Sequence, residues 1–345
     1  MKRVTMKEVA EKAGVHQSSV SMALRNHPRI GKATRERIKK IAEEMGYRPD
    51  PGLSALAAYR SGLRPAEERG EIALIGRRLH RTPTMSTTTG AILMGLHQQA
   101  ERYGYKITPF DITDPSLSPK QVNRILNARN ISGLIVMRMD LHGLNFLRGI
   151  HWDNITAVGL GRWPPYPPVT RIEHDQYNTT QQILYRMLRR GYRRIGLIHH
   201  YRNLKGISFH TEAAYLQILT RSKVAQPYPV FYLDQQPLAA LTPWAKQHDL
   251  DAVISMQEPK SLFTNKKIQQ AFMKSLGFAC LNLHNLDGTL AGMNQQLDRI
   301  GIRAVDVLVA QINRGERGFP ETVSKVLIEG RWVEGSTLPQ CRKVR

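Results

Sequence analysis

A short amphipathic stretch near the amino terminus of this 345-residue chain presents polar side chains on one side. Its apolar side carries Val20, Ala23 and Leu24 at helical spacing. The opposite side carries Gln17, Ser18, Ser21, Met22 and Arg25. Amides and hydroxyls donate and accept hydrogen bonds, which is the chemistry that distinguishes base edges in the major groove of DNA. The stretch is therefore a candidate for reading a DNA sequence.

Two neighbouring helices are expected to position this stretch. Thr5 and Glu8 have the spacing of a capping box that starts a first helix, and Gly14 supplies the left-handed residue that ends it. A third helix is expected over residues 33–45. Three short helices with a tight turn between the first two indicate a helix-turn-helix unit. A three-helix bundle with no nucleic-acid role is the alternative.

The net charge favours a polyanionic partner. The chain has 50 Lys and Arg against 28 Asp and Glu, a formal charge of +22. Residues 1–64 hold 14 basic and 6 acidic residues, or +8, so the remaining residues carry +14. The basic excess attracts nucleic acid, but a basic protein without such a partner has the same composition.

A Pro- and Gly-containing break at residues 49–52 is followed by Leu53–Arg60, which reads as a short helix. Eight residues are too few for an isolated helix in water, where about 12–15 are marginal, so this one should form only when docked. Leu56 is suited to wedging between base pairs from the minor groove.

Motifs within residues 4–60 resemble the lactose-repressor (LacI/GalR) family. They are Val4–Val15 (VTMKEVAEKAGV), Ser19–Ser21 (SVS), Thr34–Arg37 (TRER) and Gly46–Pro49 (GYRP). The resemblance implies that Gln17, Ser18 and Met22 face bases and that Leu56 is the intercalating hinge leucine. It also implies that phosphates lie near Thr5, Ser21, Asn26, Arg29 and Thr34.

Three positions depart from the family pattern. His16 stands where a serine commonly caps the second helix, and histidine is a poorer cap. Met22 stands where an arginine is frequent, and methionine cannot make the bidentate contact of arginine with guanine. Asp50 replaces a common asparagine. The DNA sequence that is read should therefore differ opposite Met22, where a thymine methyl group would suit the side chain.

From Glu71 onward, apolar strands alternate with helical stretches, which predicts parallel sheets covered by helices in two lobes. Such a body resembles the periplasmic sugar-binding fold that the same family carries. The expected fold is thus an all-α helix-turn-helix domain plus an α/β two-lobed, periplasmic-binding-protein-like domain. The expected parts are residues 1–48, a hinge and linker at 49–69, and the two-lobed body at 70–340.

The lobe boundaries are predicted from chain breaks. Prolines in Trp163–Pro168 suggest the first crossover, and the return is expected near Thr289–Gly292. Lobe 1 then comprises about 70–165 and 291–320, and lobe 2 about 169–289 and 322–340. The strand Val323–Glu329 is expected in the second lobe.

Ligands of such folds bind in the crevice at the carboxyl ends of the strands. The candidates there are Arg138, Arg162, Trp163, Phe209, Gln257, Glu258, His284 and Gln295. The family often has an arginine where this chain has Phe209-His210, Asn-Asp where it has Gln257-Glu258, and an aspartate where it has His284-Asn285. For each candidate, an ordinary surface or hinge role is the alternative.

Other function classes find little support in the sequence. Phosphate-loop, nucleophile-elbow and zinc-protease motifs are absent, so we expect neither an enzyme nor a cofactor or metal. Two distant cysteines, no apolar run of about 20 residues and no leader-like start suggest the cytoplasm and no membrane association.

The expected function is that of a homodimeric transcriptional regulator, commonly a repressor, bound to a pseudo-palindromic double-stranded operator. A carbohydrate-related small molecule between the lobes would control it. Two alternatives remain: lobes that only dimerise or recruit a protein, and a solute-binding transport component.

Overall fold

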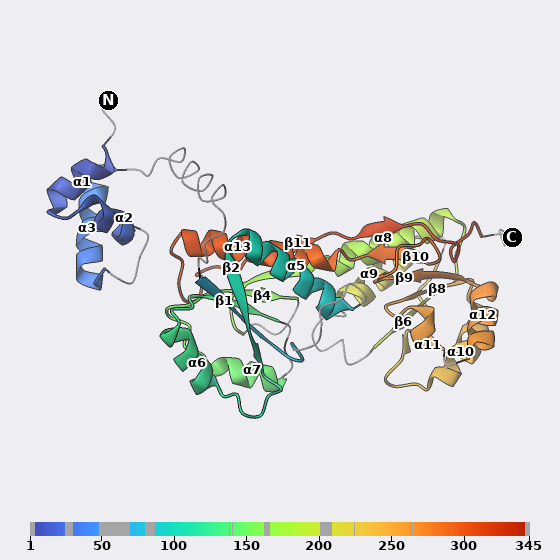
Figure 1. The fold of residues 1–345 in the computed structure, drawn as a ribbon. Coiled ribbons are helices and arrows are strands. Elements are labelled where there is room, and N and C mark those ends of the chain that lie inside the picture. The colour runs from blue at the N-terminus through green and yellow to red at the C-terminus, as the bar shows by residue number, and fades with distance from the viewer. Residues whose placement is uncertain are drawn as a thin grey trace.

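The computed structural model describes residues 4–24, 30–47, 70–79, 87–137, 139, 141–161, 166–200, 209–223, 225–263 and 265–341. Three helices form the amino-terminal unit (Figure 1): α1 (Met6–Ala13), α2 (Gln17–Leu24) and α3 (Lys32–Glu44). They confirm the three predicted helices. Their shared core consists of small and β-branched side chains that allow close packing, namely Val9, Ala10, Ala13, Val20, Ala23, Ile38 and Ala42. The predicted hinge helix with Leu56 lies outside the described residues.

The rest of the described chain contains two six-stranded sheets with helices between their strands. The first has the order β11 (Lys325–Ile328), β5 (Thr170–His174), β4 (Thr156–Leu160), β3 (Gly133–Val136), β1 (Gly70–Gly76), β2 (Tyr105–Asp111). The second has the order β12 (Arg331–Val333), β10 (Ala291–Asn294), β9 (Gly277–Cys280), β8 (Ala252–Ser255), β6 (Ile195–His199), β7 (Phe231–Tyr232). All neighbours pair in parallel except β12, which runs antiparallel to β10.

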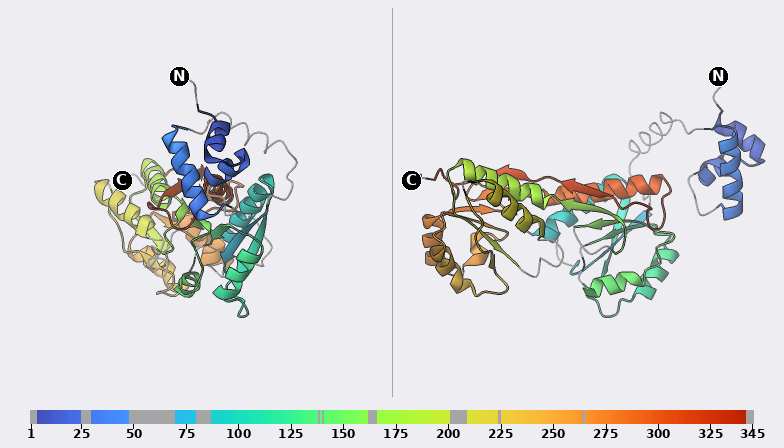
Figure 2. Two further views of the ribbon diagram at one scale, coloured as in Figure 1. Left: turned by 90° about the vertical axis from the view of Figure 1, so that its left-hand side faces the viewer. Right: turned by 180° about the vertical axis from the view of Figure 1, so that it is seen from behind.

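Helices cover both faces of each sheet, as the two views in Figure 2 show. On the first sheet, α5 (Thr88–Arg102) and α13 (Leu297–Asn313) pack on one face, and α6 (Pro119–Ala128) and α7 (Leu141–Arg148) on the other. On the second sheet, α8 (Gln176–Arg189) and α9 (Phe209–Arg221) cover one face. The other face is covered by α10 (Leu241–Gln247), α11 (Pro259–Leu262) and α12 (Lys266–Ser275), with the short 3-10 turn η2 (Leu238–Ala240) before α10. Central strands buried on both faces explain the continuous apolar runs in the sequence.

Two glycines bring α5 and α13 into close contact. A Cβ atom added to Gly301 would lie 2.7 Å from the backbone nitrogen of Leu96, and one added to Gly95 would lie 2.8 Å from the carbonyl carbon of Asp298. Neither position has room for a side chain, so the two helix backbones approach each other directly. This contact fixes the amino-terminal end of α5, which faces the second sheet through Thr88.

The predicted lobe boundaries are wrong at three strands. β5 pairs with β4 in the first sheet, so the prolines before it connect two strands of one sheet, and the chain crosses only after His174. β10 belongs to the second sheet, and the return follows Asn294. β11 pairs with β5 in the first sheet, whereas the strand Val323–Glu329 is predicted in the second lobe. Strand partners far apart in sequence decide these assignments, and local chain breaks do not report them.

Candidate functional site

The start and end of α1 are fixed by the predicted caps. The backbone nitrogen of Thr5 donates to Glu8 Oε2 at 2.6 Å, and the backbone nitrogen of Glu8 donates to Thr5 Oγ1 at 3.3 Å. Gly14 adopts φ +62° and ends the helix. The turn that follows is therefore short, and α2 packs on α1 through Val20.

This packing turns the polar side of α2 outward. Gln17 and Ser18 are exposed, while Ser21 and Met22 are half-buried at the edge of the same side. Thr5 is exposed at the start of α1 and Thr34 in the first turn of α3. The predicted contacts Asn26, Arg29 and Leu56 lie outside the described residues. The described residues thus present a polar helix side of the kind that can enter a major groove.

The imidazole of His16 caps α2 in place of the usual hydroxyl. The backbone nitrogen of Ser18 donates to His16 Nδ1 at 3.3 Å, and Ser18 Oγ lies 2.8 Å from the same nitrogen. Because the backbone bond requires an unprotonated Nδ1, the Ser18 hydroxyl can also donate its proton to that nitrogen. The lone pairs of Ser18 Oγ then remain available to a donor such as a base amino group.

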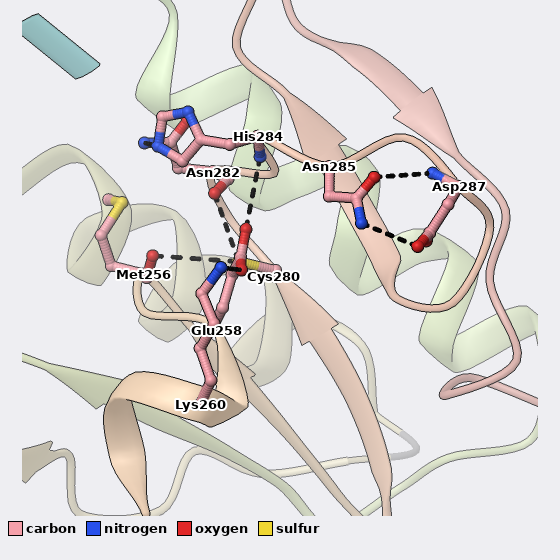
Figure 3. A network of polar contacts seen from close by, with 8 residues as sticks. All are labelled: Met256, Glu258, Lys260, Cys280, Asn282, His284, Asn285 and Asp287. Atoms are coloured by element: carbon pink, nitrogen blue, oxygen red, sulfur yellow. Dashed lines mark hydrogen bonds and ion pairs between the residues drawn. The ribbon is translucent and has the colours of Figure 1, made fainter. Parts of the chain in front are cut away.

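A second group of polar side chains lies where the strands of the second sheet end (Figure 3). Four of the crevice candidates fall here: Gln257 and Glu258 follow β8, His284 follows β9, and Gln295 follows β10. These three strands are neighbours in the sheet and run in parallel. Their carboxyl ends therefore bring the four side chains to one edge of the second sheet.

Glu258 is engaged in holding two loops together. Its side chain is buried, pairs with Lys260 Nζ at 2.8 Å and accepts from the backbone nitrogen of His284 at 3.4 Å (Figure 3). Gln295 is also committed, because its Nε2 donates to the carbonyl oxygen of Leu281 at 2.9 Å. These two candidates therefore position the strand ends. Phe209 is 58% exposed at the start of α9 and is not brought into this group.

Asn282, which sequence reasoning missed, links the two lobes. Its Nδ2 donates to Thr88 Oγ1 at the start of α5 and lies 3.3 Å from both that oxygen and His284 Nε2. The signal in the sequence is the position of Asn282 two residues after β9, close to the selected His284. The predicted candidates Arg138, Arg162 and Trp163 lie outside the described residues.

Replacing Thr88 by valine should remove the acceptor for Asn282 and lower the free energy of unfolding by about 0.5–1.5 kcal/mol. Urea titration of the full chain measures this change. Thr89→Val, one residue along the same helix and exposed like Thr88, is the matched control and should leave the free energy unchanged, because the bond from Asn282 goes to Thr88. Equal losses for both variants would contradict a stabilising contact between the lobes.

Two buried histidines are the last residues of strands: His174 ends β5 in the first sheet, and His199 ends β6 in the second. Burial lowers the pKa of His174 to about 4, although the charge of Asp175 acts in the opposite direction. Burial also lowers the pKa of His199 to about 4, with a smaller effect of His200 in the same direction. His199 Nδ1 accepts from the backbone nitrogen of His200 at 2.7 Å, so the neutral ring carries its proton on Nε2.

These two pKa values predict a loss of stability in mild acid. In the unfolded chain a histidine titrates near pH 6.5, so below that pH the unfolded state binds protons that the folded state excludes. The stability is fully present above pH 6.5 and is lost as the pH falls toward 4. Between pH 7 and 5 we expect about 2 kcal/mol per histidine, measured by urea titration. His199→Gln should reduce this dependence; a wild-type stability equal at both pH values would contradict it.

Neither a metal centre nor a membrane span is found in the described part of the chain. Among the residues that the structure describes, no three His, Cys, Asp or Glu side chains are grouped to hold a metal ion. Within the same ranges, no helix combines the length and apolar character needed to cross a bilayer.

The amino-terminal unit matches a known protein family. Residues 5–50 match the sequence profile described as bacterial regulatory proteins, lacI family. The chain carries a LacI-family helix-turn-helix domain. It is 30% identical over 141 residues to the HTH-type transcriptional regulator PtxS of Pseudomonas plecoglossicida, covering 41% of this chain and 38% of that protein. It is 26% identical over 183 residues to the sucrose operon repressor of Escherichia coli, covering 52% of each. The chain thus spans about half or less of the length of these relatives.

Solved structures of similar fold align with nearly the whole chain. The LacI-family regulator from Silicibacter pomeroyi has a TM-score of 0.53 and 20% identity, covering 97% of this chain and 99% of that one. The lac repressor dimer bound to operator and the anti-inducer ONPF has a TM-score of 0.55 and 18% identity, covering 98% and 100%. These similarities establish a LacI-like architecture: a helix-turn-helix domain followed by a two-lobed α/β body.

Proposed function

We propose that this chain is a sequence-specific DNA-binding transcriptional regulator, acting as a repressor whose operator affinity depends on a small molecule bound between the lobes. The observation that carries the proposal is the outward polar side of α2, with Gln17 and Ser18 exposed on a helix-turn-helix core. The match of residues 5–50 to the lacI family supports it. The relatives that match are transcriptional regulators, and we propose that this chain likewise acts by binding and not by catalysis.

The active form is proposed to be a cytoplasmic homodimer on a pseudo-palindromic operator. Two copies of α2 would enter successive major grooves, which requires half-sites about one helical turn apart. The proposed parts are residues 1–48 for DNA reading, 49–69 for the hinge and 70–340 for the body. Base contacts are assigned to Gln17, Ser18 and Met22, and phosphate contacts to Thr5, Ser21, Asn26, Arg29 and Thr34. Leu56 is assigned the minor-groove wedge.

The ligand is proposed to bind in the crevice between the sheets and to be related to carbohydrates. The bond between Asn282 and Thr88 joins the two lobes at that crevice, so a ligand that alters it alters the lobe arrangement. A coupling of about 1–3 kcal/mol between ligand and operator would change operator affinity about 5–150-fold. Six crevice candidates stay proposals: Arg138, Arg162, Trp163, Phe209, Gln257 and His284.

In vitro selection from random double-stranded DNA with the full chain tests this function. We expect enrichment of one pseudo-palindrome, whose affinity exceeds that for non-specific DNA by at least about a thousandfold at physiological salt. Recovery of unrelated sequences with equal affinity would overturn the proposal. A thermal-shift screen with sugars, sugar phosphates and nucleobases tests the ligand, since a compound at 100 times its Kd adds about 2.7 kcal/mol.

A further inference from the structure

A groove runs between α8 and α9 on the outer face of the second lobe, where Figure 1 shows the two helices together. It encloses about 330 Å³. Side chains of both helices line it: Tyr177, Gln181, Tyr185, Leu188, Gln217, Ile218, Arg221 and Ser222. The groove lies on the face opposite α10 and α12 and takes no part in the crevice described above.

The walls of the groove are two rows of side chains. On α8, Tyr177, Gln181 and Tyr185 follow one another at four-residue spacing, which aligns them along one side of a helix. On α9, Gln217 and Arg221 have the same spacing. The groove therefore has an aromatic wall and a polar wall that ends in a cation.

Hydrogen bonds hold the aromatic wall in place. The hydroxyl of Tyr177 donates to Gln217 Oε1 across the groove, and Gln181 Nε2 donates to the hydroxyl of Tyr185 at 3.4 Å. The side chain of Tyr185 nevertheless stays 48% exposed, which leaves a large aromatic surface in contact with water. Fixed tyrosines bind a partner at a low cost in conformational entropy.

The exposed charges at the carboxyl ends of the two helices are positive. Apart from its N-cap Asp175, which accepts from the backbone nitrogen of Asn178 at 3.0 Å, α8 carries no Asp or Glu. The single acidic residue of α9, Glu212, accepts from the Tyr232 hydroxyl at 3.0 Å. Arg189 and Arg221 are exposed at the ends of the two helices. Cations in a last turn also stabilise the helix dipole, but that effect does not account for the exposed tyrosine beside them.

We propose that this groove binds a segment of an acidic partner protein. An apolar side chain of the partner would lie against Tyr185, Leu188 and Ile218, and its carboxylates would pair with Arg189 and Arg221. Tyrosine and arginine around an apolar centre are the residues enriched where protein partners bind tightly. Arginine also holds carboxylates in a bidentate geometry.

The test uses the full chain and a fluorescein-labelled synthetic peptide that carries leucine and phenylalanine among glutamates. We expect Tyr185→Ala with Arg221→Glu to weaken binding at least about tenfold in fluorescence anisotropy. The matched control is Ile268→Ala with Lys267→Glu on α12, since Ile268 is 51% exposed and the charge change is the same. This control should bind as the wild type does. Thermal melting establishes that both variants are folded.

Crosslinking from a benzophenone group on the peptide locates the binding site independently of affinity. Crosslinks within α8 and α9 support the proposal, and crosslinks confined to other elements overturn it. Equal losses for the groove variant and the α12 control also overturn it, because they indicate general attraction to a basic chain. The proposal is also overturned if the substitutions at Tyr185 and Arg221 weaken the binding of a single-stranded oligonucleotide or an anionic vesicle but not that of the peptide.

Discussion

Replacing Gly301 by alanine should lower the free energy of unfolding by about 3 kcal/mol or more. In a helix interior, alanine ordinarily stabilises the protein by about 1 kcal/mol relative to glycine. The expected loss of stability therefore comes from the steric clash. The new Cβ atom would lie 2.7 Å from the backbone nitrogen of Leu96 and would meet backbone that cannot turn aside. α5 and α13 must then separate and lose packing in the first core. Thermal unfolding should shift downward by about 6–12 °C.

Gly133→Ala is the graded control in the same lobe. A Cβ atom there would lie 2.9 Å from Ile312 Cδ1, the end of a flexible side chain that can move. We expect a smaller loss than for Gly301→Ala. A Gly301→Ala variant as stable as the wild type would show that α5 and α13 can separate without cost.

Replacing Gln17 by alanine should remove sequence reading while leaving the attraction to DNA intact. If Gln17 pairs with a base edge, its loss costs about 1–3 kcal/mol in discrimination for each half-site. Affinity for the selected operator should therefore fall about 5–150-fold per half-site, measured by fluorescence anisotropy at fixed salt. Non-specific affinity should not change, since it depends on phosphate contacts.

Gln98→Ala makes the same change at an exposed position of α5 and should leave both affinities unchanged. Equal losses of Gln17→Ala on operator and non-specific DNA would contradict a base-reading role. Alanine favours helix at least as well as glutamine, so a weakened α2 does not explain a loss.

The amino-terminal unit could be predicted from sequence because its signals are local. The Thr5–Glu8 box, Gly14 and the spacing of Val20 and Ala23 act within a few residues of one another, and each matches the structure. The strands could be predicted too, since buried parallel strands leave apolar runs. Their distribution between the sheets could not, because β5 and β11 pair across about 150 residues of sequence.

The crevice shows the same limit at the level of side chains. Glu258 and Gln295 could be predicted at the carboxyl edge of the sheet, because each is a polar residue that follows a strand. The sequence does not reveal that Glu258 pairs with Lys260 or that Gln295 donates to the Leu281 carbonyl. The position of Asn282 after β9 marks it as a candidate, but the sequence does not show its bond to Thr88, which lies in the other lobe. Such contacts follow from tertiary structure alone.

The late position of α13 and β11 in the chain has a consequence for protein synthesis. The three amino-terminal helices can fold as soon as they leave the ribosome, since their contacts are local. The first sheet lacks its edge strand until residue 328 has been added, and its core lacks α13 until shortly before. At a synthesis rate of about 5–20 residues per second, the time between completion of the three helices and addition of residue 328 is about 15–60 s. During that time each nascent chain carries a finished helix-turn-helix unit, the part proposed to read DNA, on an unfinished body.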